Sequence, residues 1–308
     1  MVEVKNVAMS YGKNEVLKDI SFEIKNGRTV GLLGANGAGK STTMNILSGY
    51  LKPCSGKVFI EGIDITSNPV DAKRLIGYLP EIPPLYRDMK VIEYLTFAAK
   101  LKGIREYKAE VNKMMELFHL EEKCYDFIKR LSKGQQQRVG FAYALLGTPP
   151  VIILDEPLVG LDPIEAEATR KIISTLKGEH IVIISSHILK EIEELCNDIL
   201  MLKDGKIILD NSMLNAKRGG KHTYCLTLKG QKEKLEEYLK QYGELKEVRF
   251  VGEKEKDVYE FVVVSKNTRD IRDNILGYLV SKKIKVYGIM KQELSLEEVF
   301  IKMNEEEV

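Results

Sequence analysis

The sequence predicts an α/β protein with a parallel, doubly wound sheet, followed by a small α+β domain of ferredoxin-like order. Short apolar strand patterns alternate with amphipathic helical patterns through the first two-thirds of the chain, which is typical of a parallel sheet. After a basic, glycine-rich segment at Ala216–Lys221, the order becomes strand-helix-strand-strand-helix-strand. The 308 residues also exceed what one core usually organises. We therefore expect two domains, residues 1–215 and residues 221–308.

The first domain begins with antiparallel strands before the chain enters the parallel sheet. Val2–Met9 and Val16–Ile24 alternate apolar and polar residues, as half-buried antiparallel strands do. Asn26-Gly27 is typical of a hairpin turn, and Thr29–Leu33 is a short apolar run expected in the middle of a sheet. Helical spacing predicts a helix over Lys40–Ser48. Short apolar runs predict further strands at Val58–Ile60, Ile76–Leu79, Val151–Leu154, Ile181–Ile184, Ile199–Leu202 and Ile207–Leu209.

Two further stretches complete the predicted architecture. Residues from about 88 to 148 show long amphipathic patterns and few β-branched runs, which predicts a helical subdomain inserted into the sheet domain. In the second domain we expect strands and helices at Thr223–Leu228, Lys232–Tyr242, Val248–Val251, Tyr259–Val264, Thr268–Ser281 and Ile284–Gly288. A last helix is expected near Leu294–Met303.

The composition narrows the possible functions. A net charge of +2 is too small to indicate a nucleic-acid surface, so no nucleic acid is expected as a partner. No apolar run approaches the roughly 20 residues that span a bilayer, and the N-terminus lacks the pattern of a signal peptide. The four cysteines have no metal-ligand spacing. We therefore expect a cytoplasmic protein that reaches a membrane only by docking onto a partner.

The segment Gly34–Ser41 fits the phosphate-binding pattern G-x-x-x-x-G-K-[ST]. Glycines let backbone N–H groups turn inward around phosphates, and the following helix adds the positive end of its dipole. Lys40 is expected at the β- and γ-phosphates, and the Ser41 hydroxyl at Mg²⁺. Because the pattern follows a buried-type strand and opens a helix, it predicts an Mg-ATP site.

The run Val151–Pro157 places two carboxylates at the end of an apolar strand. Asp155 is expected in the magnesium shell, and Glu156 is expected to act as general base on the water that attacks the γ-phosphate. Such a strand end by itself is often a solvated turn. Together with the loop at Gly34, it indicates a nucleotide hydrolase.

The segment Leu131–Arg138 has the features of a helix N-terminus, with Ser132 as a capping candidate and Gly134 keeping the backbone open. It closely resembles the signature sequence of ABC ATPases. The loop, this segment, the carboxylate strand, Gly160-Leu161-Asp162 and His187 stand in the order of an ABC nucleotide-binding domain. The resemblance covers about Met1 to Leu214 and implies a P-loop NTPase fold of ABC type.

The resemblance also implies roles for individual residues. The phosphates and the first helical turn would use Gly34, Asn36, Gly37, Ala38, Gly39, Lys40, Ser41 and Thr42. Tyr11 looks like the aromatic residue that stacks on adenine, although such a tyrosine is also common in packing. His187 resembles the switch histidine at the γ-phosphate. Ser132, Gly134 and Gln135 would contact the nucleotide of a second subunit, and Asp162 would bridge the two subunits.

Two positions depart from the family pattern. Glu81 stands where relatives usually carry glutamine, so it is expected at Mg²⁺ or in coupling, and it adds negative charge beside Asp155 and Glu156. The Tyr-Leu-Pro-Glu run that contains Glu81 is similar to that of ATPases serving simple bacterial exporters. Lys133 replaces a usual glycine in the signature segment and leaves Ser132 and Gly134 in place.

The resemblance implies a head-to-tail homodimer that drives a separately encoded membrane permease from the inner face of the cell membrane. The end of the chain, including Leu294–Phe300, resembles the C-terminal extension of drug- and antibiotic-export ATPases, and an amphipathic helix packed on its own domain is an equally good interpretation. Glu81–Tyr94, with Pro83-Pro84 and with Leu85 and Tyr86 expected to be exposed, is the predicted surface for the permease.

Two other functions remain open from the sequence: a soluble ABC ATPase acting on ribosomes or DNA, and a nucleotide sensor without transport. Ribosome-acting relatives carry two such domains in one chain, and DNA-repair relatives insert coiled coils or zinc modules. This chain has one such domain and a compact insertion, which favours the transporter.

Overall fold

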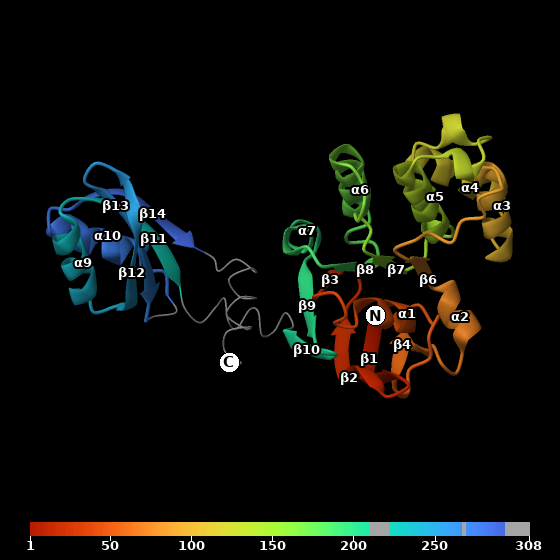
Figure 1. Ribbon diagram of the computed structural model, residues 1–308, viewed down its shortest axis with the longest axis horizontal. Helices are drawn as coiled ribbons and strands as arrows, with labels where there is room; N and C mark the ends of the chain where they lie inside the picture. The colour runs from red at the N-terminus through yellow and green to blue at the C-terminus, as the bar shows by residue number, and fades with distance from the viewer. Residues whose placement is uncertain (210–221, 267–268, 293–308) are drawn as a thin grey trace. The chain divides into compact units, whose positions relative to one another are not determined.

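The computed structural model describes residues 1–209, 222–266 and 269–292, and Figure 1 shows their arrangement. The chain divides into two compact units, Met1–Asp210 and Asn211–Val308. The glycine-rich segment Ala216–Lys221 and the helix expected near Leu294–Met303 lie outside the described residues. None of the helices in the described part of the chain has the length and apolarity that a bilayer crossing requires.

The first unit is built on a six-stranded sheet in the order β10-β9-β3-β8-β7-β6. Its strands are β3 (Thr29–Leu33), β6 (Ile76–Leu79), β7 (Val151–Asp155), β8 (Ile181–Ser186), β9 (Asp198–Lys203) and β10 (Lys206–Leu209). All pairs are parallel except the edge pair of β10 with β9. Every residue of β3, β7 and β8 is buried, because helices cover a parallel sheet on both faces. The predicted parallel sheet, with Thr29–Leu33 in its middle, is confirmed.

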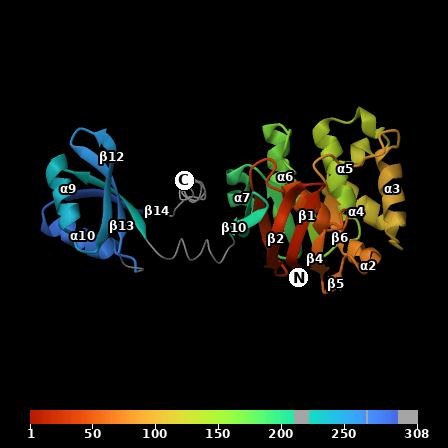
Figure 2. The same cartoon turned by 60° about the horizontal axis from the view of Figure 1, so that its bottom comes forward.

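A second, antiparallel sheet has the order β2-β1-β4-β5 and is seen face-on in Figure 2. It consists of β1 (Val2–Tyr11), β2 (Asn14–Ile24), β4 (Ser55–Ile60) and β5 (Ile63–Asp64). The hairpin expected at Asn26-Gly27 is wrong. Gly27 does take a left-handed φ of 71°, but the turn joins β2 to β3, which belong to different sheets. The true hairpin pairs Tyr11 with Asn14.

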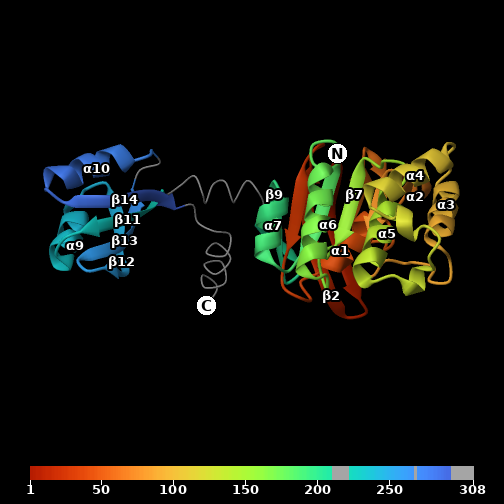
Figure 3. The same ribbon diagram turned by 90° about the horizontal axis from the view of Figure 1, so that it is seen from above.

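The helices of the first unit are α1 (Lys40–Leu47), α2 (Pro69–Arg74), α3 (Val91–Leu101), α4 (Tyr107–Leu117), α5 (Lys133–Leu145), α6 (Pro163–Thr175) and α7 (Leu189–Leu195), with short 3-10 turns η1 (Glu121–Lys123) and η2 (Ile128–Arg130). The helices α3, α4 and α5 gather beyond the β6 edge of the sheet and form the predicted helical insertion (Figures 1 and 3). One apolar core joins side chains of both sheets and α1, including Met44, Val58 and Ile153. This core fixes the loop between β3 and α1 against the carboxyl ends of β7 and β8.

The second unit has the strand order β12-β13-β11-β14, all antiparallel. Its elements are β11 (Thr223–Lys229), α9 (Lys232–Gln241), β12 (Leu245–Glu255), β13 (Val258–Ser265), α10 (Arg272–Ser281) and β14 (Lys285–Gln292). Alternate residues of the central strands, among them Leu226 and Phe261, share one apolar core with Leu239 and Ile275 of the two helices. The predicted ferredoxin-like order is confirmed, and β12 extends well beyond the expected Val248–Val251.

Candidate functional site

The loop between β3 and α1 is shaped by left-handed glycines. Gly37 has a φ of 84° and Gly39 a φ of 108°, in the region that favours glycine. A Cβ at Gly39 would lie 2.7 Å from Leu17 Cδ2. Helix α1 begins directly after Gly39, at Lys40. The loop therefore presents backbone N–H groups and a helix N-terminus to one small space, as anion sites do.

The Lys40 ammonium is folded back into this loop. Its side chain is 6% exposed, and Nζ donates to the carbonyl oxygens of Gly34 at 2.8 Å and Ala35 at 3.3 Å. It also lies 3.5 Å from Glu156 Oε1. A buried ammonium held only by carbonyls and one carboxylate is well placed to exchange these partners for phosphate oxygens.

Glu156 follows the end of β7 in a constrained backbone conformation. Its φ of 48° is left-handed, which costs a non-glycine residue about 1 kcal/mol or more. The Glu156 N–H donates to Ser185 Oγ at 2.8 Å, and the carboxylate lies between Lys40 and His187, whose Nδ1 is 3.0 Å from Oε2. The strain and the three contacts aim one carboxylate into the space in front of the loop.

Asp155, the last residue of β7, is 3% exposed. Its Oδ1 accepts hydrogen bonds from Ser185 Oγ at 2.5 Å and Ser41 Oγ at 3.5 Å. Burial raises the pKa of this carboxyl, and the two hydroxyls oppose that rise. The Asp155 carboxylate lies next to the Ser41 hydroxyl of the phosphate loop. Two such oxygens suit Mg²⁺, which prefers oxygen ligands and is usually completed by substrate phosphates. No group of three or more His, Cys, Asp or Glu residues in the described chain would hold a metal by itself.

Lys40, Glu156 and His187 line a cavity of about 510 Å³, whereas Asp155 is not among the lining residues. The full lining is Asn14, Val16, Asn36, Gly37, Gly39, Lys40, Ser41, Thr42, Glu81, Glu156, Val159 and His187. The cavity thus unites the phosphate loop with the predicted base, His187 and the exposed Glu81. Tyr11 lies at the end of β1 and is 52% exposed, and it is not among the lining residues. Its role at adenine stays a prediction.

Four predicted site residues lie elsewhere, at the starts of two helices. Ser132 Oγ accepts from the Gln135 N–H at 3.1 Å and Gln135 Oε1 accepts from the Ser132 N–H at 3.0 Å, a capping box that opens α5. Gly134 is buried behind it. Asp162 Oδ1 accepts from the Glu165 N–H at 2.9 Å and caps α6. None of the four lines the cavity around Lys40.

Ser185 is a site residue that the sequence predictions missed. It bridges Asp155 Oδ1 and the Glu156 N–H through one hydroxyl. The signal was available, because two serines end the apolar strand β8 just before His187. Parallel pairing of Asp155 with Ser185 brings the two strand ends together.

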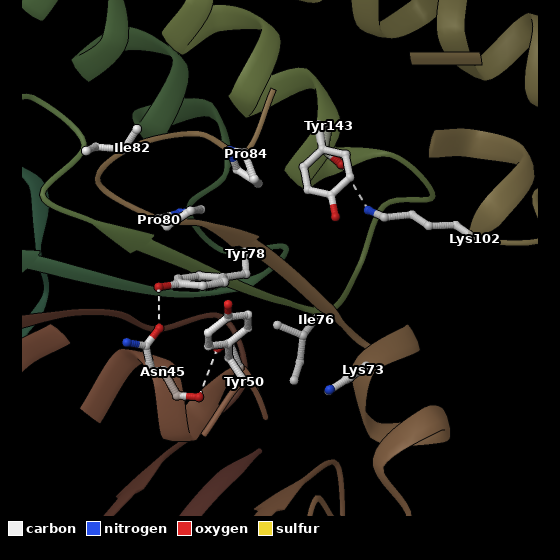
Figure 4. Close-up of a pocket in the computed structure, with 11 residues that line it drawn as sticks. Asn45, Tyr50, Lys73, Ile76, Tyr78, Pro80, Ile82, Pro84, Lys102 and Tyr143 are labelled. Carbon is white, nitrogen blue, oxygen red and sulfur yellow. Dashed lines mark hydrogen bonds between the residues drawn. The ribbon is translucent and has the colours of Figure 1, made fainter. Parts of the chain in front are cut away.

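A second cavity, of about 570 Å³, lies where β6 meets the helical subdomain (Figure 4). Tyr78 lies on its floor and donates through its hydroxyl to Asn45 Oδ1 at 3.0 Å. Tyr143 of α5 and Lys102, which directly follows α3, form the wall, and Pro80, Ile82 and Pro84 cross the opening. Lys102 and Lys73 are the two charged residues among those that line it.

Several known proteins and solved structures are similar to this chain. A profile described as ABC transporter matches residues 17–159. An uncharacterized ABC transporter ATP-binding protein of Bacillus subtilis, YxlF, is 32% identical over 98% of this chain and 99% of its own length. The linearmycin resistance ATP-binding protein LnrL of the same species is 30% identical over 98% of both chains. A solved dimeric ATP-binding cassette, MJ0796, bound to ADP and Pi, is 28% identical with a TM-score of 0.63, over 69% of this chain and 99% of its own.

Proposed function

The chain belongs to the ATP-binding proteins of ABC transporters and is an ATPase, and from this premise we propose that it works as a homodimer driving a separately encoded permease in export. One observation carries the proposal: Glu156 is held between Lys40 and His187 at the cavity formed by the phosphate loop. That arrangement brings a phosphate-binding lysine and loop next to Glu156, the proposed general base.

Binding would begin in the loop. The triphosphate enters against the N–H groups of Gly37–Ser41, and Lys40 exchanges the carbonyls of Gly34 and Ala35 for phosphate oxygens. Thr42 and Asn36 line the same wall. Ser41 and Asp155 would hold Mg²⁺, which neutralises charge on the phosphates when bound. Glu81, exposed at the cavity rim, would add a carboxylate on the side of the permease surface.

Hydrolysis would depend on Glu156 as general base. Without the Glu156 carboxylate, no group would accept the proton of the attacking water, while Lys40 and the loop would still bind the phosphates. His187 holds the carboxylate from the solvent side at 3.0 Å, so it positions the base and stands next to the γ-phosphate end of the cavity.

The second half of the site would come from another copy of the chain. Ser132, Gly134 and Gln135 form a helix start outside the cavity, where Ser132 is exposed and Gly134 is buried. A helix N-terminus suits a phosphate. The similar cassette MJ0796 was solved as a dimer with ADP and Pi. In the proposed dimer, each Ser132–Gly134 segment closes the partner's nucleotide, and Asp162 lies at the subunit boundary.

Replacing Glu156 by Gln tests the base and the dimer together. We expect ATP hydrolysis to fall by about a thousandfold, ATP affinity to stay within about threefold, and ATP to trap a dimer visible by size exclusion with light scattering. Glu167→Gln, an exposed carboxylate on α6, is the matched control. A near-normal ATPase rate in Glu156→Gln would contradict the base assignment.

Export and location at the inner membrane face are supported by full-length relatives. The protein LnrL is named for linearmycin resistance and aligns with nearly the whole chain, including the second unit. The alternative is a soluble ABC ATPase that acts on ribosomes or DNA. An ATPase assay with and without a co-purified membrane partner separates the two, because only the transporter subunit responds to the permease.

The permease would dock at the second cavity and the aromatic surface beside it. Tyr86 packs edge-on against Tyr94, with ring centroids 5.9 Å apart, and contacts Phe97 at the same separation. Ile82 is 82% exposed and Tyr86 57%, an exposure typical of an interaction surface. Leu85, expected to be exposed, is half-buried, so Ile82 and Tyr86 are the better contacts.

We expect Ile82→Asp with Tyr86→Asp to abolish co-purification with the permease encoded by the neighbouring reading frame, since two charges would be desolvated in the interface. Intrinsic ATP binding should be unchanged. Tyr125→Asp, at a 71% exposed position elsewhere in the helical subdomain, is the control. Unchanged association of the double variant would place docking elsewhere.

A further inference from the structure

The start of α5 is bonded to the chain that leaves the catalytic strand. Gln137 is 7% exposed, and its Nε2 donates to the carbonyl oxygen of Pro157 at 3.3 Å in a buried position. Pro157 follows Glu156 directly, so this hydrogen bond holds one flank of the left-handed Glu156 backbone. The Ser185 hydroxyl holds the other flank through the Glu156 N–H.

A second link joins α5 to α6. Arg138 Nη2 lies 2.8 Å from Glu165 Oε2, and each side chain is 23% exposed. The Glu165 carboxyl also covers Gly134, where an added Cβ would lie 2.7 Å from Glu165 Cδ. A charge-assisted pair shielded in this way is stronger than an exposed one. It fixes the capping segment of α5 to the first turn of α6.

Lys133 supplies a third link. Its ammonium reaches Gly160, at which an added Cβ would overlap Nζ, and Gly160 has a left-handed φ of 70°. The lysine therefore lies along the loop of its own subunit. Residues 157–165 are held at three points by the first two turns of α5.

We propose that Gln137 and Arg138 are positioning residues that couple the two nucleotide sites of the dimer. The proposal rests on the homodimer proposed above, in which the Ser132–Gly134 segment contacts the partner's ATP while Glu156 acts on its own. When α5 shifts on binding the partner's nucleotide, the hydrogen bond from Gln137 transmits that movement to the Pro157 carbonyl, next to Glu156. The same shift reaches α6 and Asp162 through the Arg138–Glu165 pair.

The test measures ATP hydrolysis by the full-length protein against ATP concentration. In Gln137→Met, which keeps the volume but loses the donor, we expect the Hill coefficient to fall to about 1 and kcat to fall about tenfold, as misplaced catalytic groups do. Glu165→Gln should lower the Hill coefficient as well, and Arg138→Lys should retain part of it. ATP binding by the monomer should be unchanged in all three.

Arg170→Gln is the control, because Arg170 lies on α6 and pairs with Glu167 and Glu194, neither of which belongs to α5. Two outcomes overturn the coupling: a wild-type Hill coefficient of about 1, or variants that lose kcat while keeping the wild-type coefficient, which is the result for a merely structural contact. Failure of Glu156→Gln to dimerise with ATP would instead remove the homodimer itself. Thermal melting identifies any variant that is poorly folded. If Gln137→Met is such a variant, the Hill coefficients of Glu165→Gln and Arg138→Lys decide.

Discussion

The carboxyl edge of the parallel sheet in the first unit and the core of the second unit differ in the kinds of side chain that they bury. Within the first unit, charged and polar side chains such as Lys40, Asp155, Glu156 and Ser185 are buried next to one another. In the described part of the second unit, Ser265 is the only polar residue of this kind. Its core instead consists of Leu, Ile, Val, Phe and one Tyr.

The difference separates what folds each unit from what the protein does. Apolar burial stabilises both units at about 25 cal/mol per Å². Buried charge costs free energy unless it is paired. Among the described residues, the buried charged side chains Lys40, Asp155 and Glu156 all belong to the first unit and lie near the strand ends, where a phosphate and a cation would offset that cost. The hydroxyl of Tyr224, a residue of the second unit's core, donates a hydrogen bond to Asp270 Oδ1 at 3.2 Å and accepts one from the Ile271 N–H at 3.1 Å.

The largest expected effect concerns the apolar core. Phe261 is fully buried, and Phe261→Ala should lower the unfolding free energy of the second unit by about 4 kcal/mol. Amide hydrogen exchange within β11 and β13 measures this loss. The ATPase rate of the purified protein should stay unchanged. Val262→Ala, at the half-buried neighbour on the other face of β13, is the control, and a parallel loss of ATPase activity in Phe261→Ala would break the separation of roles.

Lys102 tests a buried charge away from the ATP site. Its Nζ donates to the carbonyls of Tyr143 at 2.9 Å and Leu146 at 3.1 Å, and burial lowers its pKa from 10.5 to about 8. Between these values the folded protein loses the proton that the unfolded chain keeps, so folding stability rises with pH.

Relative to Lys102→Met, the wild type should therefore gain up to about 3 kcal/mol as the pH rises from below 8 to 10. Urea unfolding of both proteins across that range measures the difference. For Lys100→Met, at an exposed position on α3, the unfolding free energy should change with pH as it does in the wild type. A flat difference for Lys102 would mean that its carbonyl partners offset the burial completely.

The smallest effect is expected at Asp155. Because burial raises its pKa, the ionised form costs stability, and that cost is fully present once the pH exceeds the folded value. Asp155→Asn should raise the nucleotide-free unfolding free energy slightly near neutral pH, while ATP hydrolysis is lost. The gain should shrink on acidification. Asp162→Asn, an exposed cap that asparagine fills equally well, should change stability little, and a destabilised Asp155→Asn would refute the stated cost.

Much of the fold follows from local patterns. The apolar run Thr29–Leu33 is a central strand, and the amphipathic stretch after residue 88 is helical, because strand and helix periodicities depend only on near neighbours. The hairpin expected at Asn26-Gly27 was wrong because a turn sequence does not specify which sheet the next strand joins. The length of β12 was likewise set by pairing with β13, not by its own charged sequence.

The phosphate loop, the order of the motifs and the residue types of the site can be read from the amino-acid sequence, because each is encoded in consecutive positions. Three contacts became visible in the folded chain alone: the Ser185 hydroxyl joins Asp155 to the Glu156 backbone, Lys40 and His187 flank one carboxylate, and Gln137 donates to the Pro157 carbonyl. Local patterns do not encode these contacts, because parallel strand pairing and helix packing bring together groups that are far apart in the chain.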